Sequence, residues 1–180
     1  MIIFDDIALR RGAKLLFEGA SATLQPGQKI ALIGANGAGK SSLFAMLLGQ
    51  LALDHGTIRG HESMRVAHMA QEVATTDLSA RDHVVAGDKA TYSVLKDIAR
   101  AEAEQRYDDA ATLHQQMEML DGYSAERRAE QLLLGLGFTQ DKINNPVTSF
   151  SGGWRIRLNL AQALMTPSDL MLLDEPTNHL

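Results

Sequence analysis

The sequence predicts an α/β fold built around a parallel sheet, because strand-like and helix-like segments follow one another in a defined order. The apolar segment Lys29–Ile33 runs into a glycine-rich loop and is expected to be a buried strand. Ser41–Leu48 follows the loop with apolar residues at helical spacing, and Gly49 is expected to end that helix. Much later, the apolar run Leu170–Leu173 ends on two carboxylates, which indicates a central strand.

The first third of the chain otherwise consists of short apolar stretches separated by turns. Two short strands are expected at Ile2–Phe4 and Ile7–Leu9, with Asp5-Asp6 interrupting them. Thr57–Arg59 and Arg65–Met69 also have the composition of strands. These segments add strands to the predicted α/β fold.

The middle third has a different character, because Lys89–Leu120 contains no proline or glycine and is dense in helix-forming residues. It predicts two helices, Lys89–Ala103 and Tyr107–Leu120, joined by a tight polar turn at Glu104–Arg106. The simplest interpretation is a solvated antiparallel helix pair. Two further helices are expected at Ser124–Leu134 and Gly153–Met165.

Composition excludes several classes of protein. The chain has 180 residues, a formal net charge of −5 and no cysteine. The charge argues against a binder that covers nucleic acid with its whole surface, and the missing thiols exclude disulfides and thiolate metal sites. The first residues lack the basic start of a signal peptide, and no apolar run approaches the ~20 residues that cross a bilayer. We therefore expect a cytoplasmic protein that does not itself insert into a membrane.

The glycine-rich loop fits the pattern G-x-x-x-x-G-K-[ST] at every fixed position. Its glycines allow backbone N–H groups to wrap a β-phosphate, and the helix that follows adds its positive end. Lys40 would neutralise β- and γ-phosphate oxygens, and the Ser41 hydroxyl would be a Mg²⁺ ligand. The predicted cofactors are therefore ATP and Mg²⁺. The predicted nucleotide-binding residues are Gly34, Ala35, Asn36, Gly37, Ala38, Gly39, Lys40, Ser41 and Ser42.

The two carboxylates after Leu170–Leu173 are the second element of this chemistry. Asp174 should belong to the Mg²⁺ shell, and Glu175 should polarise the attacking water as general base. An acidic strand end alone is often only a solvated loop. After a phosphate loop in the same chain, it favours ATP hydrolysis.

A third element lies between them in the sequence. Ser151 is a natural N-cap, and Gly152 and Gly153 open the following helix so that bare N–H groups face outward. The three residues form a second candidate anion site, although in isolation they could be only a capped helix.

The order of these elements resembles the ATP-binding-cassette (ABC) ATPases, in which a Ser-Gly-Gly signature precedes the acidic strand. The resemblance implies a P-loop ABC core with a small antiparallel β-subdomain. It also implies that Ser151, Gly152 and Gly153 contact the γ-phosphate held by a second cassette. Gln71, which follows a strand in Met69-Ala70-Gln71-Glu72, is similar to the family's Q-loop glutamine and would join the Mg²⁺ shell. Its alternative is an ordinary surface glutamine.

Two features, together with the lack of an apolar run long enough to cross a membrane, resemble the ABC-F branch, whose members are soluble, carry two cassettes on one chain and mostly act on ribosomes. The ending Asp174–Leu180 is similar to that branch's D-E-P-T-N-H-L-D, without the final Asp. Gln71 and Ser151 lie 80 positions apart (151 − 71), and the excess falls on the helix pair, where ABC-F proteins carry an arm. The stretch Phe150–Leu164 resembles the YheS-like group.

The resemblance implies that residues 1–180 are the first cassette of a longer protein, C-terminally truncated, with residues 89–122 as an inserted arm. We expect the 180 residues to bind ATP with little turnover. The implied function is that of a ribosome-associated translation factor. The alternative is the ATP-binding subunit of a membrane transporter, and a third reading, a non-catalytic scaffold, is opposed by Glu175.

Two observations do not fit the family pattern. Lys89–Gly122 contains four basic and seven acidic residues, whereas an arm that grips RNA phosphates should be basic. The aromatic residue that stacks on adenine in the family is missing before Gly12, where Arg10 and Arg11 stand. A guanidinium can stack on a base, so Arg11 is a candidate for the adenine contact.

Overall fold

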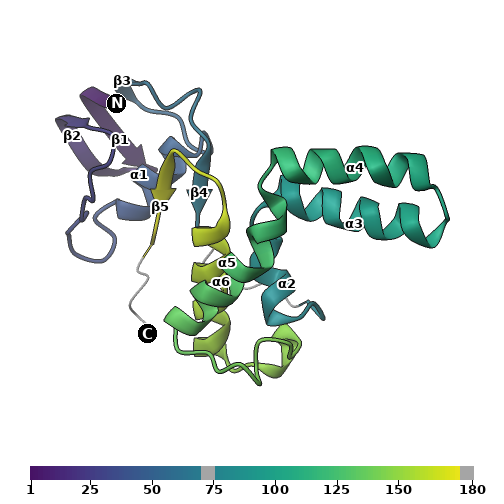
Figure 1. Cartoon of the computed structure of the whole chain (residues 1–180). Helices are drawn as coiled ribbons and strands as arrows, with labels where there is room; N and C mark the ends of the chain where they lie inside the picture. Colours follow the sequence, from purple (N-terminus) through teal and green to yellow (C-terminus); the bar gives the residue numbers. More distant parts are fainter. Residues whose placement is uncertain (70–75, 175–180) are drawn as a thin grey trace. The chain divides into compact units, whose positions relative to one another are not determined.

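The computed structural model describes residues 1–69 and 76–174. The chain divides into two compact units, Met1–Val66 and Ala67–Leu180 (Figure 1). Within the described residues, no helix combines the length and the apolar character that crossing a membrane requires.

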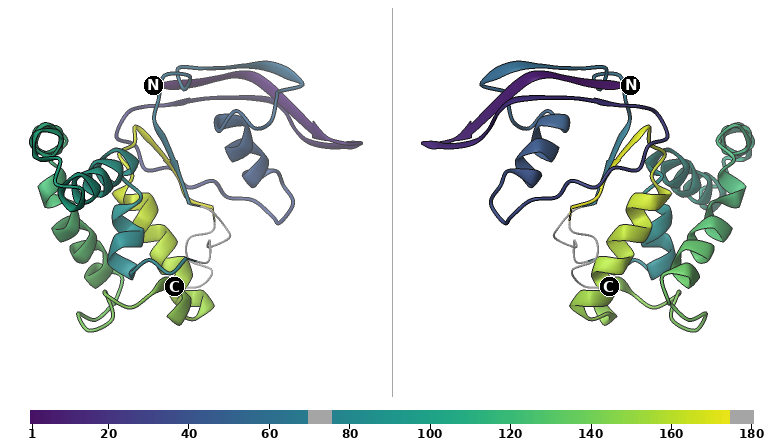
Figure 2. Two further views of the ribbon diagram at one scale, coloured as in Figure 1. Left: turned by 90° about the vertical axis from the view of Figure 1, so that its right-hand side faces the viewer. Right: turned by 90° about the vertical axis from the view of Figure 1, so that its left-hand side faces the viewer.

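The first unit is built on a three-stranded antiparallel sheet of order β2-β1-β3, formed by β1 (Ile2–Arg11), β2 (Lys14–Leu24) and β3 (His55–Arg59) (Figure 2). The predicted break at Asp5-Asp6 is wrong, because β1 is one continuous strand. Its register shifts between Phe4 and Ile7, and Asp6 has a φ of 49°. A bulge of this kind takes up extra residues without ending the strand.

The expected buried strand at Lys29–Ile33 does not form. The segment is irregular, its side chains are exposed, and Ile33 is 90% exposed. A strand exists only through hydrogen bonds to a neighbouring strand. Within the described residues of the first unit the sheet contains only β1, β2 and β3, and none of them pairs with this segment.

Helix α1 (Lys40–Leu47) confirms the predicted helix and starts one residue earlier. Gly49 ends it in the predicted way, with a φ of 70°. Its N–H donates to the Met46 carbonyl at 2.9 Å, and the next N–H, of Gln50, donates to Ala45 at 2.8 Å. This pair of bonds is a Schellman motif, which satisfies the last carbonyls of the helix.

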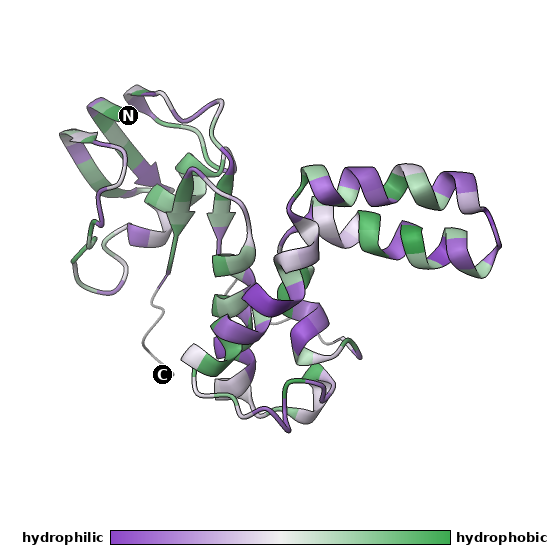
Figure 3. Ribbon diagram, in the orientation of Figure 1, coloured by the Kyte–Doolittle hydropathy of each residue, from purple (hydrophilic) through white to green (hydrophobic). Residues whose placement is uncertain are grey.

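The second unit packs helices around an apolar core and adds a two-stranded sheet. Its strands are β4 (Val66–His68) and β5 (Leu170–Leu172), both mostly hydrophobic in Figure 3. Its helices are α2 (Ala80–Val85), α3 (Lys89–Ala103), α4 (Tyr107–Met119), η1 (Gly122–Ser124), α5 (Ala125–Gly135), η2 (Val147–Ser149) and α6 (Gly152–Met165). The buried core contains Ala80, Val84, Val85, Ala125, Ala129, Leu133, Phe138, Ile143, Val147, Phe150, Leu158, Ala161 and Met165.

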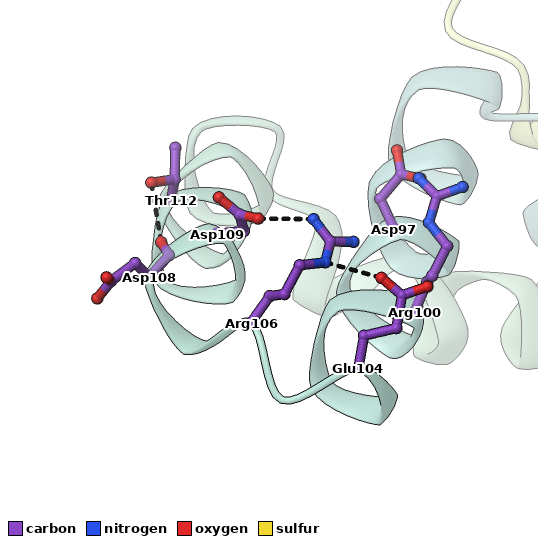
Figure 4. A network of polar contacts seen from close by, with 7 residues as sticks. All are labelled: Asp97, Arg100, Glu104, Arg106, Asp108, Asp109 and Thr112. Carbon is purple, nitrogen blue, oxygen red and sulfur yellow. Dashed lines mark hydrogen bonds and ion pairs between the residues drawn. The ribbon is translucent and has the colours of Figure 1, made fainter.

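The predicted helix pair is confirmed, with α3 and α4 lying side by side as a hairpin (Figures 1 and 2). At the turn, Arg106 donates to Glu104 at 2.8 Å and to Asp109 at 2.6 Å, while Arg100 donates to Asp97 at 2.6 Å (Figure 4). Two of the four basic side chains of residues 89–122 are therefore already neutralised by carboxylates of the same hairpin.

Helix α2 was not expected from the sequence, although its start carries a recognisable signal. The Ser79 hydroxyl accepts a hydrogen bond from the Asp82 N–H at 3.0 Å, which caps the helix. The helix has only six residues, so its apolar residues are too few to show a helical period. Its place is fixed by packing against α5 and α6.

His83 of α2 is buried against α6 and is 5% exposed. The Gln162 side-chain amide donates to the His83 carbonyl at 2.9 Å, and Asn159 hydrogen-bonds to the His83 ring. Among the described residues the Nε2 atom has no hydrogen-bond partner. Burial lowers the pKa of His83 from its usual 6.5, although the bond with Asn159 acts in the opposite direction. The structure therefore favours the neutral ring.

We predict that His83 makes the chain less stable as the pH falls below 6.5, the ordinary pKa of the group. Below its ordinary pKa of 6.5, His83 takes up a proton in the unfolded chain but not in the folded one. Its contribution is therefore complete above that pH and is lost as the pH falls toward the lowered value. His83→Asn should flatten the dependence of the melting temperature on pH. An equally steep dependence in His83→Asn would contradict this assignment.

Candidate functional site

The predicted phosphate loop passes directly into α1. Gly37 and Gly39 have φ values of 76° and 105°, in the region that favours glycine. The Ala38 N–H donates to the Ala35 carbonyl at 3.1 Å, and Gly39 is the residue that caps α1. The pattern of glycines in the sequence therefore corresponds to the backbone turns that the loop makes.

The Lys40 side chain folds back over the loop. Its Nζ atom donates to the Gly34 carbonyl at 2.8 Å and to the Ala35 carbonyl at 3.3 Å. The cation thus lies against the glycine loop at the N-terminus of α1, where both the charge and the helix end favour an anion. Phosphate oxygens could replace the two carbonyls as acceptors. Ser41 is exposed and Ser42 is buried, at 8%.

Residues at the start of β2 contact the loop and support it. The sequence did not indicate this support. The Lys14 ammonium donates to the Gly37 carbonyl at 3.1 Å. A Cβ atom at Gly39 would lie 3.2 Å from the Cβ of Leu16, which is closer than side chains normally approach. Arg11, the candidate for the adenine contact, is exposed and pairs in register with Lys14. It therefore lies at the end of the hairpin that touches the loop.

The Ser-Gly-Gly segment lies in the second unit, at the start of α6. Ser151 is the N-cap residue, as predicted, and its carbonyl accepts from the Arg155 N–H at 2.9 Å. Its hydroxyl makes no capping hydrogen bond, so the expected side-chain cap does not form. Ser151 and Gly152 are exposed and Gly153 is half-buried. The first N–H groups of a 14-residue helix thus lie beside exposed residues.

The predicted acidic strand end also belongs to the second unit. Asp174 follows β5 and is 9% exposed, while Glu175 lies outside the described residues. The Met69 N–H donates to the Leu172 carbonyl at 3.1 Å, so the chain leaves β4 and β5 at neighbouring points. Gln71, which comes after β4, also lies outside the described residues.

The donor atoms offered by Ser41 and Asp174 are a hydroxyl and a carboxylate, which are the hard oxygen ligands that Mg²⁺ takes. Mg²⁺ bound with a nucleotide needs only one or two protein carboxylates, because phosphate and water supply the rest. Ser41 of the first unit and Asp174 of the second are thus each a type of ligand that Mg²⁺ accepts.

Comparison with known proteins finds matches over nearly the whole chain. A family model described as ABC transporter matches residues 17–178. The ATP-binding protein YheS of Haemophilus influenzae is 48% identical over 180 residues, which are 100% of this chain and 28% of that protein. Human ATP-binding cassette sub-family F member 3 is 36% identical over 177 residues, which cover 94% of this chain and 24% of that protein. The chain therefore spans roughly a quarter of the length of these relatives.

A solved structure extends the likeness to three dimensions. It shows a metal-chelate type ABC transporter in an inward-facing conformation, and it matches with a TM-score of 0.64 at 23% identity. The match covers 99% of this chain and 62% of the other. The predicted fold class, an ABC ATPase core with a small antiparallel sheet and a helical hairpin, is thereby confirmed.

The glycine loop before α1 and the serine–glycine start of α6 lie in one matched region. With that match over residues 17–178, the chain belongs to the ABC transporter family, and its sequence relatives there include YheS and sub-family F member 3.

Proposed function

We propose that the chain is an ATP-binding and ATP-hydrolysing cassette that binds ATP with Mg²⁺ through Gly34–Ser42. The observation that carries the proposal is the Lys40 ammonium, held 2.8 Å from the Gly34 carbonyl at the N-terminus of α1. A fixed cation, a glycine loop and a helix end together supply the charge and the N–H donors that a polyphosphate needs.

Each predicted residue has a role in this reaction. Lys40 would bind the β- and γ-phosphates, and Ser41, Gln71 and Asp174 are the proposed Mg²⁺ ligands. When bound, Mg²⁺ neutralises charge on the phosphate oxygens. Glu175 accepts a proton from the attacking water as general base, which makes the water a better nucleophile for the γ-phosphorus.

The proposed hydrolysis requires a second cassette. Ser151, Gly152 and Gly153 would contact the γ-phosphate held by the phosphate loop of that cassette, so that two ATP molecules lie between two cassettes. The lengths of the relatives support this arrangement, since the chain covers 28% of the Haemophilus protein. Residues 1–180 would then be the first cassette, with residues 89–122 as an inserted arm.

We further propose that the whole protein is a cytoplasmic translation factor of the ABC-F type that acts on the ribosome. The similarity to sub-family F member 3 and the α3–α4 hairpin support this assignment. Arg100 and Arg106 are ion-paired within the hairpin, and carboxylates are in excess. A protein surface therefore fits the arm better than an RNA backbone does.

The alternative is the ATP-binding subunit of a membrane transporter. The structural likeness to an ABC transporter favours it, but at 23% identity that likeness concerns the fold. YheS of Haemophilus influenzae and human sub-family F member 3 are more similar in sequence, at 48% and 36% identity. We therefore favour the translation factor.

Replacing Lys40 with alanine should lower the affinity for Mg²⁺–ATP by about a hundredfold or more, because charge-assisted hydrogen bonds to two phosphates are lost. Isothermal titration of the purified protein measures this directly. Lys29→Ala removes the same charge from an exposed position of the same unit and should leave the affinity unchanged. If Lys40→Ala binds ATP as tightly as the Lys29 variant, the phosphate site is wrongly assigned.

The full-length protein carrying Glu175→Gln should bind ATP without turning it over and should sediment with ribosomes only when ATP is present. Loss of the general base leaves binding intact and holds the two cassettes closed. Co-sedimentation with and without ATP tests this, and Lys40→Ala in the same background provides the control without bound nucleotide. Absence from the ribosome fractions, with ATP binding intact, would favour the transporter subunit.

A further inference from the structure

Two aromatic residues flank the Ser151–Gly153 segment in the sequence, and the ring of a third contacts both of them. Phe150 lies directly before it and Trp154 directly after it, and both rings meet the ring of Phe138. The centroid of Phe138 is 5.5 Å from that of Phe150 and 4.7 Å from that of Trp154, with interplanar angles of 70° and 69°. These edge-to-face arrangements are the favoured geometry for aromatic pairs. One ring therefore holds both ends of the segment.

The end of α5 fixes the backbone of Phe138. Gly137 has a φ of 88°, and its N–H donates to the Leu134 carbonyl at 3.0 Å. The Phe138 N–H donates to Leu133 at 3.1 Å, which completes a Schellman motif. Phe138 is 3% exposed and belongs to the same core cluster as Leu133. Its ring therefore has little freedom to move.

Two cations also lie over the ring of Trp154. The guanidinium of Arg157 lies 4.7 Å from the centroid of the indole, and the Lys142 ammonium lies 5.9 Å from it. Arg157 also donates to the Leu136 carbonyl at 3.2 Å, at the end of α5. Cations over an indole face are attracted to it. The indole is thus held by the edge contact with Phe138 and by two cations.

These contacts hold the start of α6, which the side chain of the N-cap residue does not. The Ser151 hydroxyl makes no capping hydrogen bond, so the serine side chain does not fix the start of α6. Its neighbours Phe150 and Trp154 hold that start through Phe138 instead. The Ser151 hydroxyl does not accept a hydrogen bond from the first N–H groups of α6. Both the hydroxyl and the N–H groups can therefore bind a ligand.

We propose that Phe138 is a positioning residue for the Ser151–Gly153 segment and sets the geometry with which this segment meets the ATP of the opposite cassette. The inference rests on the proposed function, in which the segment contacts a γ-phosphate. Phe138 is buried and acts only through Phe150 and Trp154. Its loss should therefore affect turnover and leave ATP binding at the phosphate loop unchanged.

The test uses the full-length protein with Phe138→Leu, Trp154→Leu and Met165→Ala. Met165→Ala is the matched control, because it truncates a buried side chain of the same core cluster at the other end of α6. We call the contacts of Phe138 with Phe150 and Trp154 the aromatic clamp. Amide hydrogen exchange over residues 150–155 reports on this clamp. Steady-state kinetics and ATP titration report on its role in hydrolysis.

Removing either ring contact should raise the exchange rate over residues 150–155 by about tenfold, the change that corresponds to the loss of such aromatic pairs. kcat should fall by a similar factor in Phe138→Leu and Trp154→Leu, with the ATP affinity within about twofold of wild type. Met165→Ala should leave exchange over these residues and kcat near the wild-type values. Trp154→Leu keeps the test decisive if Phe138→Leu fails to fold.

Unchanged exchange over residues 150–155 in the ring variants would overturn the clamp. Faster exchange with unchanged kcat would overturn its role in positioning. If the wild-type full-length protein hydrolyses no ATP, the proposed function fails, while the exchange data still decide whether the clamp exists.

Discussion

The structure of the second unit depends on the burial of helix α6. Leu158 and Ala161 are fully buried, and α2 and α5 both pack against the helix. The backbone approaches are close, since a Cβ atom at Gly87 would lie 2.2 Å from the Gln162 carbonyl oxygen. Burial of one leucine-sized side chain contributes roughly 1.5–3 kcal/mol, so several such contacts fix the helix firmly. The apolar side chains along α6 therefore place the body of the helix, and the contacts of Phe138 with Phe150 and Trp154 hold its start.

Helix α6 also packs against the residues next to the acidic strand end. Leu160 and Ala163 pack with Met69, and Leu173 lies against this small cluster. Met69 and Leu173 stand beside the points where the chain leaves β4 and β5. The second unit thus carries its candidate anion site and its candidate metal ligand on elements that share one apolar contact. The phosphate loop belongs to the first unit, where the hairpin start at Lys14 supports it.

The basic side chains of the helical hairpin have different partners from those of the phosphate loop. Lys40 and Lys14 both donate to loop carbonyls, which an anionic ligand can replace or supplement. The arginines of the hairpin face carboxylates instead, and Lys96 lies 5.5 Å from the centroid of the Tyr92 ring. Such exposed ion pairs contribute little stability. They do remove positive charge from a surface that would otherwise attract phosphates.

Elements whose residues interact over short distances could be predicted from the sequence. The glycine loop, α1 with its end at Gly49, and the helices α3 and α4 all follow from local backbone preferences and helical spacing. The continuity of β1 through its bulge, the position of α2 and the irregular state of Lys29–Ile33 depend instead on contacts between distant segments. The tertiary structure also brought Phe138 between Phe150 and Trp154. Strand pairing and ring contacts join residues far apart in the chain, so no local pattern encodes them.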